Sequence, residues 1–136
     1  MSDVRKEVAS IICQNDAYDR RKWLAQEAAD LATRVPHLDE IPAQAILPLA
    51  KLVADGESDV ARLAQALDID KAILDEHLDA LCEFKFAEWT GIGYTPTAAG
   101  AQAFDAIGQQ MVARQLFELR RQLDQLERLS QLGLAS

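Results

Sequence analysis

Two short amphipathic segments separated by a tight break constrain the fold of this chain most strongly. Apolar side chains recur every three or four residues from 60 to 67 and again from 74 to 81, the spacing of one face of a helix. Asp68 and Ile69 lie between the two patterns, and Asp70 is a good capping residue for the second helix. We therefore predict two packed helices joined by a turn of a few residues.

The segment before this pair, residues 43–54, is nearly all apolar and predicts a central helix. Pro48 should kink or shorten its first turn. Gly56 should end this helix in the left-handed conformation, and Ser58 should cap the helix that follows. Three helices are therefore expected in close succession.

The residues after the third helix predict a β-hairpin and a long final helix. Residues 84–89 are rich in aromatic side chains and alternate in part, as a strand does. Residues 91–93, Gly-Ile-Gly, are typical of a turn, and Tyr94 and Thr95 are expected to return as a second strand. Thr97 should cap a helix from about residue 98 to 132.

The 136 residues suit one domain with a helical extension, and the pattern divides them into three regions. Residues 1–40 predict two helices, at about 3–13 and 17–34. Residues 41–100 hold the three helices and the hairpin, and residues 101–136 hold the last helix.

Charge and composition exclude several classes of protein. Hydrophobic residues make up 49% of the chain but aromatic residues only 6%, a mixture that favours helices. The 14 Lys and Arg residues against 22 Asp and Glu residues give 14 − 22 = −8, which excludes a basic nucleic-acid-coating protein and a polybasic membrane-surface protein.

Targeting signals and cysteine usage predict a cytoplasmic protein. The longest apolar run, 43–54, is interrupted and shorter than the ~20 residues that a membrane-spanning helix needs. The N-terminal residues carry acidic groups and no apolar segment typical of an export signal. Cys13 and Cys82 are expected to be buried free thiols in a reducing compartment.

From about residue 41 to 107 the chain resembles the winged-helix core of the MarR-type regulators. The similarity lies in residues 58–67, in residues 70–81 and in the Tyr-Thr-Pro-Thr-Ala-Ala-Gly run at 94–100. The resemblance implies a mainly α fold, in which a winged helix-turn-helix core with a small two-stranded β-hairpin wing is flanked by N- and C-terminal dimerisation helices. It also implies that the third helix enters the DNA major groove.

The expected recognition helix departs from the pattern of that family. Asp75 lies where a small hydroxyl is common and Glu76 where arginine is common. Asp75, Asp79 and Glu83 follow i, i+4, i+8 spacing, which places an acidic row on one face. The face that we expect to contact a partner consists of Asp70, Lys71, Ala72, Asp75, Glu76, Asp79 and Glu83.

The charge of the chain is concentrated in this region. Residues 55–88 contain three Lys and Arg residues and ten Asp and Glu residues, so they carry 3 − 10 = −7 of the total charge. Residues 86–112 contain no Lys or Arg at all. Because affinity for DNA depends largely on neutralising phosphates with Lys and Arg, we expect no specific DNA binding. The alternative is that local geometry tolerates the acids.

The last helix carries an apolar stripe with 4-3-4-3 spacing, formed by Val112, Leu116, Leu119, Leu123 and Leu126. Such a/d spacing over about two heptads predicts a dimerisation seam. The alternative is that the stripe packs on the chain's own N-terminal helices.

No motif in the sequence indicates catalysis or cofactor binding. His37 and His77 lie in no metal-ligand spacing, and His77 is expected at the edge of its helix. We expect no enzyme activity, no metal and no cofactor. The family resemblance implies a small aromatic effector, for which Tyr18, Trp23 and Trp89 are candidate lining residues, but we expect core or interface packing for them.

The sequence thus predicts a homodimeric protein of transcription control that acts mainly through contacts with a partner protein bearing a basic surface, as an adaptor, anti-repressor or DNA mimic. The alternative is a conventional MarR-like DNA-binding repressor.

Overall fold

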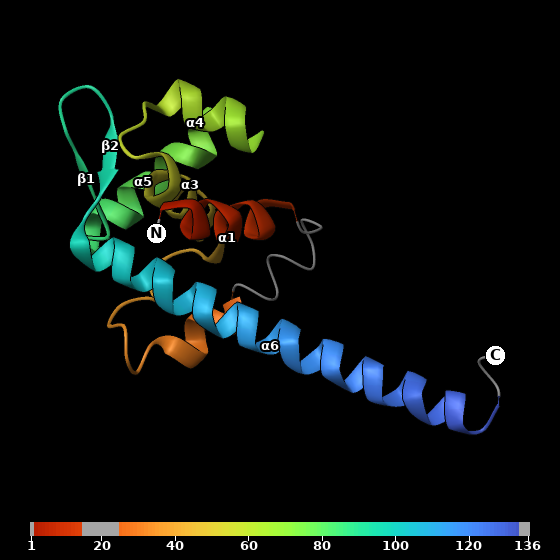
Figure 1. Cartoon of the computed structure of the whole chain (residues 1–136). Coiled ribbons are helices and arrows are strands. Elements are labelled where there is room, and N and C mark those ends of the chain that lie inside the picture. The colour runs from red at the N-terminus through yellow and green to blue at the C-terminus, as the bar shows by residue number, and fades with distance from the viewer. Residues whose placement is uncertain (1, 15–24, 134–136) are drawn as a thin grey trace.

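The computed structural model describes residues 2–14 and 25–133 as a mainly helical chain with one two-stranded antiparallel hairpin (Figure 1). A further helical segment lies at residues 25–31. The remaining elements, in chain order, are α1 (Ser2–Gln14), the 3-10 turn η1 (Ala43–Ala45), α3 (Ile46–Asp55), α4 (Val60–Leu67), α5 (Lys71–Glu83), β1 (Ala87–Trp89), β2 (Tyr94–Pro96) and α6 (Ala98–Gln131).

Helix α3 lies at the centre of the fold, as its apolar sequence predicts. It packs against α1, α4, α5, α6 and β2. Pro48 is the third residue of α3, where the missing N–H has no partner to lose, and η1 precedes this first turn. The core residues around α3 include Leu49, Leu63, Leu74, Leu78 and Leu81, all buried as expected, whereas Val53 and Leu67 are only half-buried.

The helix that we expected to continue to residue 34 ends at residue 31 in the structure. Turns follow, in which the backbone N–H of Val35 donates to the carbonyl of Leu31. Leu38 and Ile41 from this connector are buried in the core, and His37 stacks on Phe84 with ring centroids 5.2 Å apart. The connector therefore packs against the body of the protein, because Leu38 and Ile41 are buried in the apolar core.

The cap of α4 is Asp59 and not Ser58, so that prediction is wrong. The Asp59 carboxylate accepts a hydrogen bond from the backbone N–H of Arg62 at 2.7 Å. Ser58 instead forms an isolated β-bridge with Tyr94, whose backbone groups it both donates to and accepts from. Gly56 has the expected positive φ of 82°, but its ψ of −155° is extended rather than left-handed helical, because the chain runs straight into this bridge.

The caps of the other two helices are confirmed. The Asp70 carboxylate accepts from the backbone N–H of Ala72 at the start of α5, and the Thr97 hydroxyl accepts from the N–H of Gly100 at the start of α6. Each bond satisfies an amide that the first turn of a helix leaves free.

The hairpin is shorter than predicted, because Phe84 and Phe86 belong to the C-terminal cap of α5 and not to the first strand. Lys85 has a φ of 66° and its N–H donates to the carbonyl of Cys82, while the N–H of Phe86 donates to that of Leu81. These two bonds form a Schellman motif, so β1 cannot begin before Ala87. The register pairs Ala87 with Pro96, Glu88 with Thr95 and Trp89 with Tyr94.

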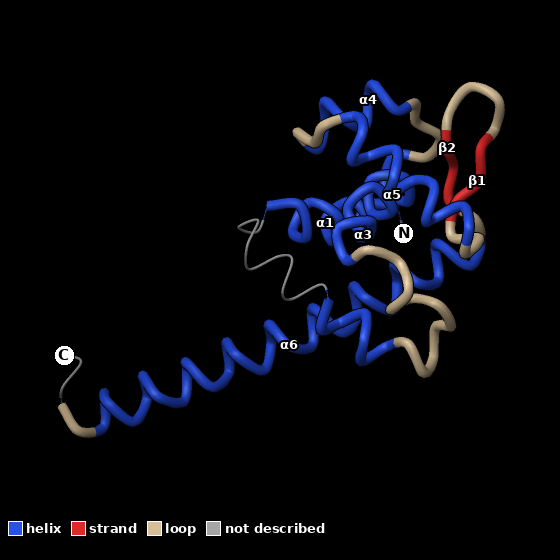
Figure 2. The backbone as a smooth tube through the Cα atoms, turned by 180° about the vertical axis from the view of Figure 1, so that it is seen from behind, coloured by secondary structure: helices blue, strands red, loops and turns tan. Residues whose placement is uncertain are grey.

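Helix α6 leaves the body of the protein halfway along its length and projects as an arm (Figure 2). Its buried residues, from Gly100 to Met111, all lie in the first half. At 34 residues it is ~51 Å long, and about 30 Å of it extends beyond Met111. Among the described residues, no helix combines the length and the apolar character that crossing a membrane requires.

Candidate protein-binding face

Helix α5 exposes every residue of the face that the sequence singles out. Its other side carries Leu74, Leu78 and Leu81, which are fully buried and fix the rotation of the helix. The exposed residues are Asp70, Lys71, Ala72, Asp75, Glu76, Asp79 and Glu83. The structure therefore places all seven on the solvent side of one amphipathic helix and its cap.

The carboxylates of this face are not neutralised from within the described part of the chain. No ion pair to Asp75, Glu76, Asp79 or Glu83 forms among residues 2–14 and 25–133. The nearest cation in the sequence of α5, Lys71, has no such pair either. With Lys71 as its one cation against five carboxylates, the face consequently presents a predominantly negative field to anything that approaches it.

The hairpin adds an aromatic pair beside the acidic row, which the sequence analysis missed. The rings of Trp89 and Tyr94 meet edge to face with centroids 5.0 Å apart. Burial raises the pKa of Tyr94, and the charges of Cys82, Asp79 and Asp75 raise it further. The strand register, which pairs these two residues directly, is the signal that brings them together.

Cys82 lies between the acidic row and the hairpin. It is half-buried rather than buried, so that expectation is corrected, and it is a free thiol. Partial burial raises the pKa of its thiol, and the nearby carboxylates of Asp79 and Glu88 raise it further. Cys82 is thus protonated and a poor nucleophile at neutral pH. Cys13 lies in α1, but its side chain is outside the described residues.

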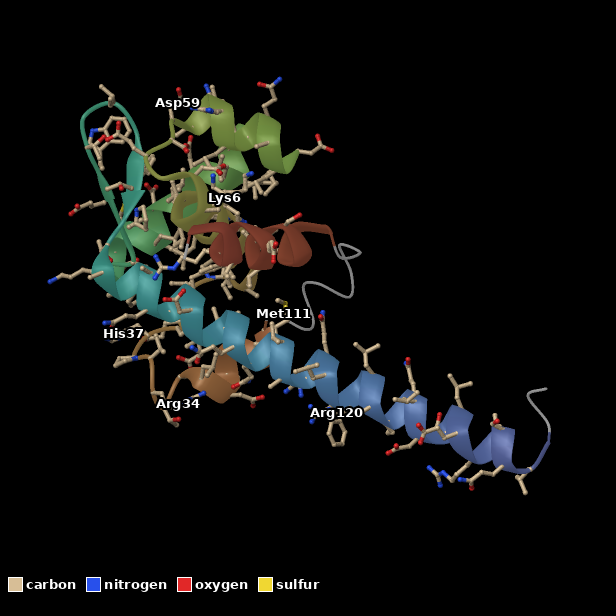
Figure 3. The ribbon with its side chains drawn as sticks, viewed as in Figure 1. Lys6, Arg34, His37, Asp59, Met111 and Arg120 are labelled. Carbon is tan, nitrogen blue, oxygen red and sulfur yellow. The ribbon has the colours of Figure 1, made fainter. Side chains whose placement is uncertain are left out.

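His77 is buried, with 8% of its surface exposed, rather than at the helix edge as expected. Desolvation lowers the pKa of its imidazole, against a smaller opposing effect of Glu76. Its Nδ1 has no hydrogen-bond partner within the described part of the chain. His37 is exposed, pairs with Glu40 and lies in the connector (Figure 3). Groups of three or more His, Cys, Asp and Glu suited to hold a metal ion are absent from the described residues.

The apolar stripe of α6 is exposed along the arm, from 39% at Val112 to 60% at Leu119. Its five residues are Val112, Leu116, Leu119, Leu123 and Leu126. Arg114 still contacts Glu27 and Asp30 of the body, whereas the part of α6 that carries Arg120 projects away from the rest of the described chain (Figure 3). Within the described residues, α1 and residues 25–31 leave most of the stripe exposed, and residues 15–24 of the expected second helix lie outside the described part of the chain.

The stripe continues into a groove between α1 and α6. This groove has a volume of about 830 Å³ and is lined on the α1 side by Val4 and Val8 and on the α6 side by Phe104, Val112 and Leu116. The Arg5–Asp105 ion pair, at 2.7 Å, closes one edge. The apolar surface thus extends from the body of the protein onto the arm.

Of the three aromatic residues considered for an effector, one lies in the described part of the chain. Trp89 lies on the hairpin, whereas Tyr18 and Trp23 fall outside the described residues.

No family model matches the sequence, and no curated protein or solved structure is significantly similar to it.

Proposed function

We propose that this chain is a winged-helix homodimer of transcription control that acts mainly through protein–protein contacts, with the acidic face of α5 as its contact surface. The single observation that carries this proposal is that all seven residues of that face are exposed while its carboxylates stay unpaired among the described residues.

The order of the elements supports the winged-helix assignment. A short turn with Asp68 in the left-handed conformation joins α4 to α5, and the two-stranded hairpin follows directly. In proteins of this architecture the second helix of the pair is the one presented to a partner. Here that helix is α5, which makes its surface chemistry the decisive property.

The charge of α5 and the hairpin argues against DNA as that partner. In a groove complex, Asp75 and Glu76 would lie close to phosphates, and β1 and β2 contain no Lys or Arg with which to offset them. A basic protein surface is attracted by the same field that repels DNA. An adaptor, anti-repressor or DNA mimic binds its partner protein through such an acidic surface.

The exposed stripe on α6 supports the homodimer. Five large apolar side chains at 4-3-4-3 spacing on a projecting helix form the seam that a second copy of the same helix would cover. A dimer would present two acidic faces related by symmetry.

The test is an anisotropy titration of fluorescent genomic DNA fragments at low salt and at about 150 mM salt. We expect no specific binding by the natural chain at either salt. The double change Asp75→Lys with Glu76→Arg should create non-specific, salt-sensitive binding. The matched control Asp39→Lys with Asp124→Lys makes the same charge change at exposed sites off α5 and should create much less.

Sequence-selective binding by the natural chain at about 150 mM salt would overturn the proposal and favour the conventional repressor. In that case Asp75 and Glu76 would read bases or be tolerated by local geometry, as isolated carboxylates can accept hydrogen bonds from cytosine.

A further inference from the structure

The hairpin presents an aromatic pair at the border of the acidic row, and the two together form one composite surface. We call it the aromatic–acidic face and define it by Asp75 and Asp79 of α5, Trp89 of β1 and Tyr94 of β2. The acidic row alone marks only a solvated helix. The adjoining exposed indole is what makes the surface unusual.

Three observations place these side chains next to one another. Strand β1 packs against α5, and β1 pairs with β2 in register at Trp89 and Tyr94. Asp75, Asp79 and Cys82 follow i, i+4, i+7 spacing and so share one face of α5. Because Asp75 and Asp79 both raise the pKa of the Tyr94 phenol, these two carboxylates lie near the hairpin.

Trp89 is held in place although 57% of it is exposed. Its ring rests on Tyr94, and the turn beyond it is closed by Thr90, whose hydroxyl accepts from the N–H of Gly93 at 3.1 Å. The N–H of Thr90 donates to the carbonyl of Gly93 at 2.8 Å. The indole is therefore a positioned surface and not a loose side chain, although a tryptophan of a folded chain is normally largely covered.

We infer that the aromatic–acidic face binds an arginine-rich segment of a partner protein. This inference rests on the proposed function, because it names the chemistry of the partner that the α5 face takes. A guanidinium group stacks flat on an indole or phenol ring while its fork of N–H donors pairs with a carboxylate, and this face offers both kinds of group side by side. The ammonium of lysine is compact and strongly hydrated, so it uses the carboxylates but gains less from the rings.

The charge of the face selects against other occupants. Asp75 and Asp79 repel the phosphates of nucleic acids and of anionic membranes, so the exposed Trp89 does not indicate either one. Ile92, 74% exposed, is a further exposed apolar side chain in the turn between the two strands.

The test compares an oligo-arginine with an oligo-lysine peptide of equal length, titrated by calorimetry onto the full chain at about 150 mM salt. We expect the arginine peptide to bind about fivefold more tightly. Trp89→Leu should abolish this preference, and Trp89→Tyr should keep most of it. The matched control Phe117→Leu changes another exposed aromatic residue, on the arm, and should leave the preference intact.

A second pair of variants separates the role of charge. Asp75→Asn with Asp79→Asn should weaken both peptides by about tenfold each, because both lose the attraction of two carboxylates. Asp39→Asn with Asp124→Asn alters the net charge equally and should have a much smaller effect. Unfolding curves of all variants should match that of the natural chain, since the altered side chains are exposed.

The outcomes distinguish this inference from the proposed function. Equal affinity for the two peptides, together with no effect of Trp89→Leu, overturns the arginine inference but leaves an acidic face that binds basic proteins. Absence of binding by both peptides, or binding that ignores Asp75→Asn with Asp79→Asn, overturns both. Binding of DNA or of anionic vesicles that depends on Trp89 also overturns the inference.

Discussion

Arg114 of α6 lies against Glu27 of the helical segment 25–31, and its Nε is 2.8 Å from Oε1 of Glu27. The Glu27 side chain has no exposed surface. The same guanidinium donates a hydrogen bond to Asp30 at 2.9 Å. The contact with Glu27 lacks the N–H direction of a hydrogen bond, and neither Glu27 oxygen has a hydrogen-bond partner among the described residues. One arginine thus compensates two acids where α6 leaves the body of the protein.

Removing Arg114 should therefore destabilise the fold strongly. Arg114→Met leaves the buried charge of Glu27 without a partner, and we expect a loss of ~3 kcal/mol, the lower end of the range for a broken buried pair because Arg114 is itself partly exposed. Glu27→Leu combined with Arg114→Met should recover most of that loss. Denaturant unfolding measures both, and an Arg114→Met variant as stable as the natural chain contradicts this account.

Two glycines of α6 make a matched pair of predictions. A Cβ at Gly100 would lie 1.9 Å from the backbone carbonyl oxygen of Phe86, whereas a Cβ at Gly108 would lie 2.9 Å from a methyl carbon of the Val8 side chain. Alanine gains ~1 kcal/mol of helix propensity over glycine at either site. Because a backbone oxygen cannot turn aside as a side chain can, Gly100→Ala should destabilise the fold by at least ~2 kcal/mol.

Gly108→Ala should remain within about 1 kcal/mol of the natural chain in either direction, because the propensity gain offsets a small movement of Val8. Thermal unfolding of the two variants side by side is the measurement. Equal effects at the two positions would show that α6 does not approach the backbone of Phe86 as described.

The pH dependence of stability should carry the signature of His77. Burial lowers its pKa in the folded chain, so the unfolded chain binds the proton more readily. Stability is then fully present above the ordinary histidine pKa of ~6.5 and is lost as the pH falls through that value. We expect the free energy of unfolding of the natural chain to fall between pH 7 and pH 5.

His77→Leu should remove this part of the pH dependence, since leucine suits the neighbouring apolar residues Leu74 and Leu78. His37→Gln, a change of the exposed histidine in the connector, is the comparison variant. Parallel pH profiles for the natural chain and His77→Leu would refute the role of His77.

The sequence predicts those parts of this structure that depend on neighbours along the chain. The apolar spacing locates α3, α4, α5 and α6, and the caps Asp70 and Thr97 follow from side-chain chemistry. Ser58 and Asp59 are both good caps, and local sequence does not choose between them. The bridge from Ser58 to Tyr94 decides, and that contact joins residues far apart in the sequence.

Some features of the candidate site also follow from the local sequence, and others depend on contacts between distant residues. The exposed acids of α5 follow from helix periodicity, because its buried leucines fix which face is outside. The proximity of Tyr94 to Asp79 depends on how the hairpin folds back on α5, and the contact of Arg114 with Glu27 spans most of the chain. Helix spacing already places His77 on the side of Leu74 and Leu81, and the packing of η1, β1 and α4 around α5 then buries it.

The arm gives the clearest prediction about assembly. Leu119 and Leu123 lie in the middle of the exposed stripe, at 60% and 55% exposure. We expect the natural chain to sediment as a dimer of its 15.0 kDa protomer at micromolar concentration. Leu119→Glu with Leu123→Glu should raise the dissociation constant at least about a hundredfold, because each buried leucine lost costs ~2–5 kcal/mol.

The control for this change adds the same charge elsewhere on the same helix. Gln125→Glu with Gln131→Glu introduces two acids on α6 away from the stripe and should leave the dimer intact, whereas truncation after Arg114 should give a monomer or an insoluble chain. Because Leu119 and Leu123 are exposed on the arm of their own protomer, the monomeric Leu119→Glu, Leu123→Glu variant should keep the unfolding transition of the body. Sedimentation of the natural chain as a 15.0 kDa species would show that the stripe does not pair with a second copy.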